Sequence, residues 1–70
     1  MGKNKIKVSF EWKGILIKFK ISKRAYQLCC CVAKRHGVKL EELYIGAYKI
    51  GNGKPTEESL IKYLDLRYQI

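Results

Sequence analysis

Two runs of alternating apolar and polar residues lie on either side of Lys13-Gly14, and they constrain the fold more than any other feature. A period of two is typical of a strand with one buried face. If Lys13-Gly14 forms a two-residue hairpin loop, Trp12 lies opposite Ile15 and all the alternating apolar side chains share one face. These side chains are Ile6, Val8, Phe10, Trp12, Ile15, Ile17, Phe19 and Ile21. A slip of one residue would turn a whole row to solvent, so we predict this register for the hairpin.

The segment after the hairpin has the signals of a helix over residues 23–36. Ser22 is a good N-cap, and Gly37 can end the helix in the left-handed conformation. One stripe is apolar and is long enough to cover the apolar face of the hairpin. The stripe consists of Ala25, Leu28, Cys29, Val32 and Ala33.

Residues 38–50 fit two structures. As strands, 43–45 and 48–50 flank Gly46-Ala47, which can form a two-residue turn. As a helix, Leu40, Leu43, Tyr44 and Ala47 share one face. A glycine inside a helix costs about 1 kcal/mol, and Lys39 stands where a capping side chain is wanted, so both features argue against the helix.

The C-terminal part begins with a loop over residues 51–55. Thr56 can then cap a short turn of helix. Apolar residues alternate with polar ones over 64–70, which predicts a half-buried final strand. A helix through 57–68 is the alternative, since Leu60, Ile61, Leu64 and Tyr68 also align.

The order hairpin, helix, short hairpin, helical turn and strand resembles the ubiquitin-like β-grasp over about residues 5–70. Within it, residues 14–37 (GILIKFKISKRAYQLCCCVAKRHG) are most similar to SUMO-like domains. The resemblance implies an α+β fold of ββαββ order with a short helical turn before the last strand. It also implies a single domain over 1–70, with its ordered core in 5–70. Conjugated members end in Gly-Gly, whereas this chain ends Tyr68-Gln69-Ile70, so we expect no conjugation.

The SUMO-like resemblance implies a non-catalytic protein-interaction module. In such domains an extended peptide adds to the edge strand beside the helix. The partner expected here is a protein or peptide with an acidic-hydrophobic segment, bound by a monomer. The positions that match the groove are Leu16, Ile17, Lys18, Phe19, Lys20, Leu28, Cys31 and Arg35.

Residues 15–51 are also similar to ribbon-helix-helix DNA-binding domains. The spacing matches that of a ribbon-helix-helix domain: a strand (IKFKI), a Ser cap, a first helix and the start of a second helix. This resemblance implies a homodimeric transcriptional regulator that pairs its strands and places Lys18 and Lys20 in the major groove. We favour the β-grasp because strand 15–21 already has a partner in 6–12, and because the alternating tail has no place in the other fold.

Positive charge is concentrated in the first part of the chain. The net charge is +9, and residues 1–40 contain 11 basic side chains and only one acidic side chain. This distribution suits a nucleic acid or an acidic partner. Since 12 of the 15 basic residues are lysines rather than arginines, the case for bidentate base or phosphate readout is weaker. The candidate nucleic-acid contacts are Lys3, Lys5, Lys7, Lys13, Lys18, Lys20, Lys23 and Arg24.

The sequence offers no arrangement for catalysis. It has no nucleophile with a histidine and an acid, no metal-ligand spacing and no glycine-rich phosphate loop, so we expect no enzyme, cofactor or metal. Cys29, Cys30 and Cys31 read as reduced thiols on one helix, of which one or two belong to the core. Free thiols, with no secretory signal and no membrane-spanning run, favour a reducing intracellular compartment, the cytoplasm or the nucleus.

Overall fold

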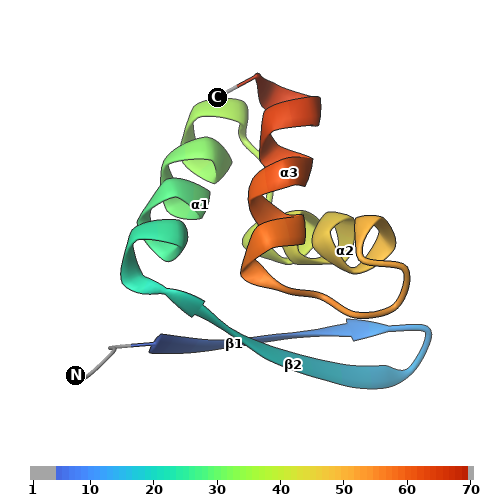
Figure 1. Cartoon of the computed structure of the whole chain (residues 1–70). Helices are drawn as coiled ribbons and strands as arrows, with labels where there is room; N and C mark the ends of the chain where they lie inside the picture. The colour runs from blue at the N-terminus through green and yellow to red at the C-terminus, as the bar shows by residue number, and fades with distance from the viewer. Residues whose placement is uncertain (1–4, 70) are drawn as a thin grey trace.

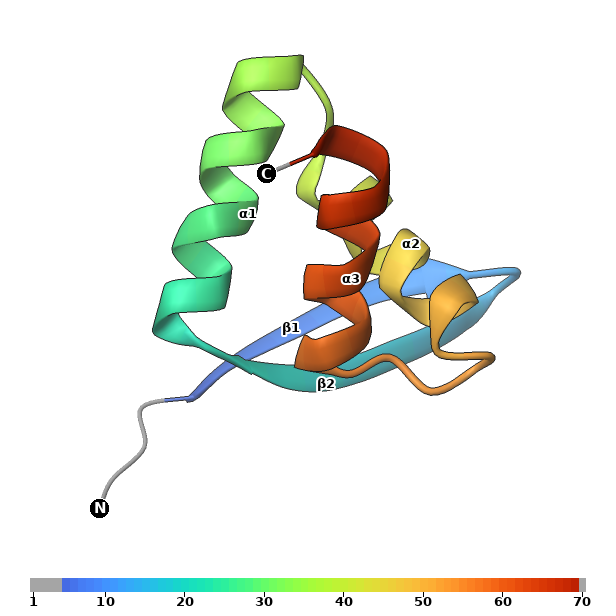
Figure 2. The ribbon, with the colours of Figure 1, turned by 45° about the horizontal axis from the view of Figure 1, so that its top comes forward.

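A β-hairpin with three helices packed on one of its faces makes up the fold (Figure 1). The structure is a computed structural model that describes residues 5–69. The elements follow in the order β1 (Lys5–Trp12), β2 (Ile15–Ser22), α1 (Lys23–His36), α2 (Leu40–Ile50) and α3 (Glu57–Tyr68). The second view shows all three helices above the same face of the hairpin (Figure 2). The α+β class is therefore confirmed.

The hairpin has the register that the alternation predicts. β1 and β2 pair antiparallel, with Trp12 opposite Ile15 and Ile6 opposite Ile21. Lys13 and Gly14 form the connection with φ of 53° and 81°, since a two-residue turn with the twist of the strands needs positive φ at both positions. The inner face carries most of the apolar row into the core, where Phe10 is almost completely buried, whereas Ile15 beside the turn is 63% exposed.

Helix α1 begins and ends where the sequence predicts. The Ser22 hydroxyl accepts a hydrogen bond from the backbone N–H of Ala25, and Gly37 ends the helix with φ of 66°. Ala25, Cys29 and Val32 are buried, so the predicted apolar stripe faces the core. The expectation that at least one cysteine is a core residue is confirmed by Cys29, whose side chain has 0% exposure.

Residues 40–50 form helix α2, which decides between the two structures that fit this segment. Leu43, Tyr44 and Ala47 are buried on one face, and Lys39 provides no side-chain cap. Gly46 packs closely against α3, because a Cβ there would overlap the ring of Tyr63 unless that ring moved. The glycine that argues against a helix from the sequence is therefore the residue that lets two helices approach closely.

The predicted final strand over 64–70 is wrong, because residues 57–68 continue as helix α3. Thr56 and Ser59 cap its start reciprocally: the Thr56 hydroxyl accepts from the backbone N–H of Ser59, and the Ser59 hydroxyl accepts from that of Thr56. Leu64 is buried together with Leu60, four residues earlier, whereas Leu66 is 67% exposed. The buried residues therefore follow the spacing of a helix and not the alternation of a strand. Ile70, the last residue of the expected strand, lies outside the described residues.

The ββαββ order of the β-grasp is not confirmed. Its second pair of strands would occupy segments that form α2 and α3, and the sheet within residues 5–69 has the two strands β1 and β2. β2 pairs with β1 of the same chain, as the predicted hairpin requires. All five elements contribute to one core, with Phe10, Ile21, Cys29, Leu43 and Leu60 each supplied by a different element.

Candidate nucleic-acid interface

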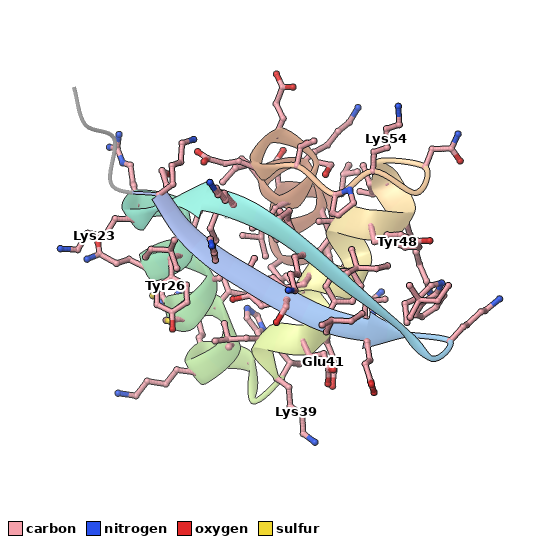
Figure 3. All side chains as sticks on the ribbon, turned by 90° about the horizontal axis from the view of Figure 1, so that it is seen from below. Lys23, Tyr26, Lys39, Glu41, Tyr48 and Lys54 are labelled. Carbon is pink, nitrogen blue, oxygen red and sulfur yellow. The ribbon has the colours of Figure 1, made fainter. Side chains whose placement is uncertain are left out.

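The outer face of the hairpin is uncovered and carries a row of lysines. Because strand side chains alternate between faces, the apolar row of each strand points to the helices and its polar row points away. Figure 3 looks onto this outer face, and the hairpin lies in front of all three helices. Its lysines are all exposed: Lys5 and Lys7 on β1, and Lys18 and Lys20 on β2. We call these four residues the lysine face.

The register brings like charges together on the lysine face. Lys7 lies directly opposite Lys20, and Lys18 lies opposite Ser9. Like charges in directly opposed positions destabilise a strand pair. The one ion pair within 4.0 Å in residues 5–69 joins Lys5 Nζ to the carboxylate of Glu57 at 3.7 Å, so it leaves the Lys7–Lys20 pair without an anion.

Further cations lie at both ends of the hairpin. At the turn, the Lys13 and Lys49 ammonium groups lie 5.6 and 5.0 Å from the centroid of the Trp12 ring. At the other end, Lys23 and Arg24 are exposed in the first turn of α1. The structure therefore places the described members of the predicted nucleic-acid set along one ribbon and at its ends. Lys3 lies outside the described residues.

Lys49 is a cation near the hairpin turn that the sequence did not indicate. It lies in the last turn of α2, 37 residues after Trp12 in the sequence, and only the packing of α2 against the hairpin brings it there. Trp12 also contacts the ring of Tyr48, with 6.0 Å between centroids. A helix over 40–50 was one of two open alternatives, and no sequence signal connects Lys49 to the hairpin turn.

The predicted peptide groove is divided between separate surfaces. Ile17 and Phe19 are half-buried on the inner face of β2 and pack against the core, whereas Leu16 lies on the outer face with Lys18 and Lys20. Leu28 is half-buried on α1, in a depression that Ile61 of α3 also lines. Cys31 and Arg35 are exposed further along α1.

The start of α3 occupies the space beside β2 and α1. The Glu57 carboxylate accepts a hydrogen bond from the backbone N–H of Ser22 at 2.7 Å and another from the Ser22 hydroxyl at 3.0 Å. These bonds, together with Lys5, hold the pKa of Glu57 below its usual range, although partial burial acts in the opposite direction. Glu57 thus fixes the junction between the hairpin and the helices, where the peptide groove was expected.

The remaining surface of the described residues has a depression of about 1010 Å³ that is open to solvent and is lined by mixed apolar and charged side chains, among them Lys5, Leu28, Glu57 and Asp65. Residues 5–69 contain no group of three His, Cys, Asp or Glu side chains that could hold a metal ion. In the same residues, no helix has the length and apolar character needed to cross a membrane.

The three thiols lie in different environments along α1. Cys29 is buried, Cys30 is half-buried and Cys31 is exposed, and all three are free. Burial raises the pKa of the Cys29 thiol to about 12, and the neighbouring Cys30 adds to this effect. Cys29 is therefore an unreactive core residue, as sequence considerations suggest for small buried thiols.

Comparisons of the chain with protein-family models, with curated proteins and with solved structures find no match.

Proposed function

We propose that the protein binds double-stranded DNA by placing the outer face of its hairpin in the major groove. The major groove of B-DNA is about 12 Å wide and admits a two-stranded β-ribbon. The hairpin is such a ribbon, complete within one chain, with helices on the opposite face only. The deep, narrow major groove of double-stranded RNA would not admit it. The proposed role is binding without catalysis, by a monomer.

The observation that carries this proposal is the unneutralised pair of Lys7 and Lys20. Two ammonium groups in directly opposed positions weaken the hairpin that presents them. A row of phosphates would remove this repulsion and would release counterions from the DNA. Lysine suits this role because it acts as a point charge toward phosphate.

The length of the hairpin allows its two ends to contact the DNA backbone. Each strand has eight residues, which corresponds to a length of about 27 Å at about 3.4 Å per residue. A ribbon of this length can lie along the groove, with its two strands side by side across the groove width of about 12 Å, and its two ends then approach the phosphates at the groove edges. Lys13 at the turn, and Lys23 and Arg24 at the start of α1, would contact the DNA backbone there.

An acidic-hydrophobic peptide is a weaker candidate ligand. Of the residues expected to line its groove, only Leu16, Lys18 and Lys20 share the outer face, while Ile17 and Phe19 are turned to the core. The free thiols of Cys29, Cys30 and Cys31 fit an intracellular reducing compartment, where DNA is available.

Binding to a duplex of roughly 20 base pairs, measured by fluorescence anisotropy between about 50 and 200 mM salt, tests the proposal. Replacing Lys7 and Lys20 with Ala should weaken binding at least tenfold, and should lower the slope of log K against log salt by about 2. The same substitutions should leave the melting temperature unchanged or raise it, because they remove the repulsion. A loss of binding with retained stability therefore reports the interface.

The matched control replaces Lys34 and Lys62, two exposed lysines on α1 and α3, with Ala. Lys34 lies in the last turn of α1, at the end of that helix far from the hairpin (Figure 1). The control should bind DNA nearly as well as the unaltered protein. An equal loss in both variants, no binding at low salt, or tighter binding to double-stranded RNA or to an acidic peptide would refute the proposal.

A further inference from the structure

The outer face of the hairpin contains one carboxylate among its lysines. Glu11 is the only acidic side chain in residues 1–40. It lies on β1 in the polar row that also contains Lys5, Lys7 and Ser9, and it is exposed. No cation lies within 4.0 Å of its carboxylate in residues 5–69, so Glu11 does not neutralise the lysine face through an ion pair. A carboxylate on a surface that meets phosphates would only weaken binding to the DNA backbone.

An exposed leucine lies directly opposite this carboxylate. The register pairs Glu11 with Leu16, whose side chain is 56% exposed on the outer face of β2. Both residues lie in the half of the hairpin near the turn, which extends past α2 in Figures 1 and 2. No helix within residues 5–69 covers Leu16, so an acidic group and an apolar group form one uncovered pair at this end of the ribbon.

The chemistry of this pair matches two groups on the floor of the major groove. A carboxylate there accepts a hydrogen bond from the N4 amino group of cytosine, and an apolar side chain contacts the C5-methyl group of thymine. Both groups belong to base edges, which specify sequence, whereas lysine–phosphate contacts only position a protein on DNA. Glu11 and Leu16 are therefore suited to recognise base sequence, which lysine–phosphate contacts do not specify.

We propose that Glu11 and Leu16 read a cytosine and a thymine in neighbouring base pairs. The inference rests on the proposed function, because it requires the outer face to lie in the major groove. Directly opposed residues have Cβ atoms about 5 Å apart, and successive base pairs are about 3.4 Å apart, so the two side chains reach adjacent steps. Lys18, two residues from Leu16 on the same face, would contact the DNA beside them.

Selection of duplexes from a random pool, followed by anisotropy on the enriched duplex, tests this inference. The unaltered protein should enrich a cytosine next to a thymine. Changing either base pair should weaken binding about tenfold. Replacing the thymine with deoxyuridine removes only the methyl group, so this change should weaken binding by the unaltered protein and not by Leu16→Ala. Glu11→Gln should bind duplexes that lack this cytosine more tightly and should shift the preference from cytosine to adenine.

Glu58→Gln is the matched control, since Glu58 is an exposed acid on α3. It should leave the enriched sequence unchanged. If Glu11→Gln strengthens binding equally for all sequences, or if the pool yields no preference while binding still depends on Lys7 and Lys20, the base-reading inference is wrong and the DNA-binding proposal stands. If no duplex binds at low salt, both are wrong.

Discussion

Replacing Gly46 with Ala should destabilise the protein, although alanine is the better helix former. Gly46 lies inside α2, and a Cβ at this position would overlap the ring of Tyr63 on α3. The ring would have to move, and it would then lose its edge-to-face contact with Tyr68, in which the centroids are 6.2 Å apart. The substitution therefore sets a local gain against a loss in packing.

The two effects have comparable sizes. Alanine gains about 1 kcal/mol over glycine in a helix interior. Inserting a methyl group into a filled contact costs about 1–3 kcal/mol, and an aromatic pair contributes about 0.5–1.5 kcal/mol. We expect a cost of about 2 kcal/mol in packing and a net loss of about 1 kcal/mol in the free energy of unfolding. For a domain of this size, the melting temperature should fall by about 4–8 °C.

A double-mutant cycle with Tyr63→Ala separates the two effects. Urea unfolding can be followed through Trp12, the only tryptophan, which is half-buried against Tyr48. Without the Tyr63 ring, the clash is absent, and Gly46→Ala should stabilise the protein by about 1 kcal/mol. The sign of the effect should thus reverse between the two backgrounds.

A stabilising effect of Gly46→Ala in the unaltered protein would refute the packing argument. Equal effects in both backgrounds would refute it as well, because they would show that Tyr63 does not restrict position 46.

Two further predictions concern Glu57 and the cysteines. Glu57→Gln should lower the free energy of unfolding by about 1 kcal/mol near neutral pH, a value reduced for the partial exposure of this side chain. Because hydrogen bonds from Ser22 lower the folded-state pKa, the stability that Glu57 contributes is present above the ordinary pKa of 4.5 and is lost as the pH falls below it. Urea midpoints measured from about pH 7 to pH 3 should therefore converge for the two proteins, and a constant difference would contradict this reasoning. In alkylation followed by mass spectrometry, Cys31 should react readily and Cys29 should react only after unfolding, since Cys29 is buried and has a raised thiol pKa. Equal rates for these two thiols in the native protein would be inconsistent with the structure, and equal rates in denaturant are the control.

The hairpin and α1 could be predicted from the sequence because their signals are local. Each apolar residue of the hairpin has one possible face once Lys13-Gly14 is taken as the turn, and the structure has the same pairs. The two ends of α1 follow from Ser22 and Gly37. The Ser22 side chain caps the first turn, and the positive φ of Gly37 ends the last turn. Neither element depends on information from the rest of the chain.

The two later helices were harder to predict because their deciding features are tertiary or ambiguous. Gly46 makes room for the ring of Tyr63, which lies 17 residues further along the chain. The sequence therefore shows that the glycine disfavours a helix, but it does not show the contact with Tyr63. In the tail, Leu64 and Leu66 fit a strand while Leu60 and Leu64 fit a helix. The reciprocal cap between Thr56 and Ser59 favours the helix, but it uses serine where the usual signature has Glu or Gln.

The candidate interface was predicted only in part. The lysines of the hairpin follow from the same alternation as its core, so their common face could be derived from the sequence. The isolation of the hairpin as a two-stranded ribbon could not, because further strands were expected in the segments that form α2 and α3. The pairing of Glu11 with Leu16 was implicit in the register, and it gained importance only because the structure leaves Leu16 56% exposed on the outer face.

The junction at Ser22 limits which changes in chain length the fold can tolerate. Ser22 is both the last residue of β2 and the N-cap of α1, so no linker separates the hairpin from the helices. One residue added or removed here would rotate α1 by about 100° and turn Ala25, Cys29 and Val32 away from the core. Relatives of this protein should therefore differ in length at the loop of residues 51–55, and should keep an uninterrupted passage from strand to helix at Ser22.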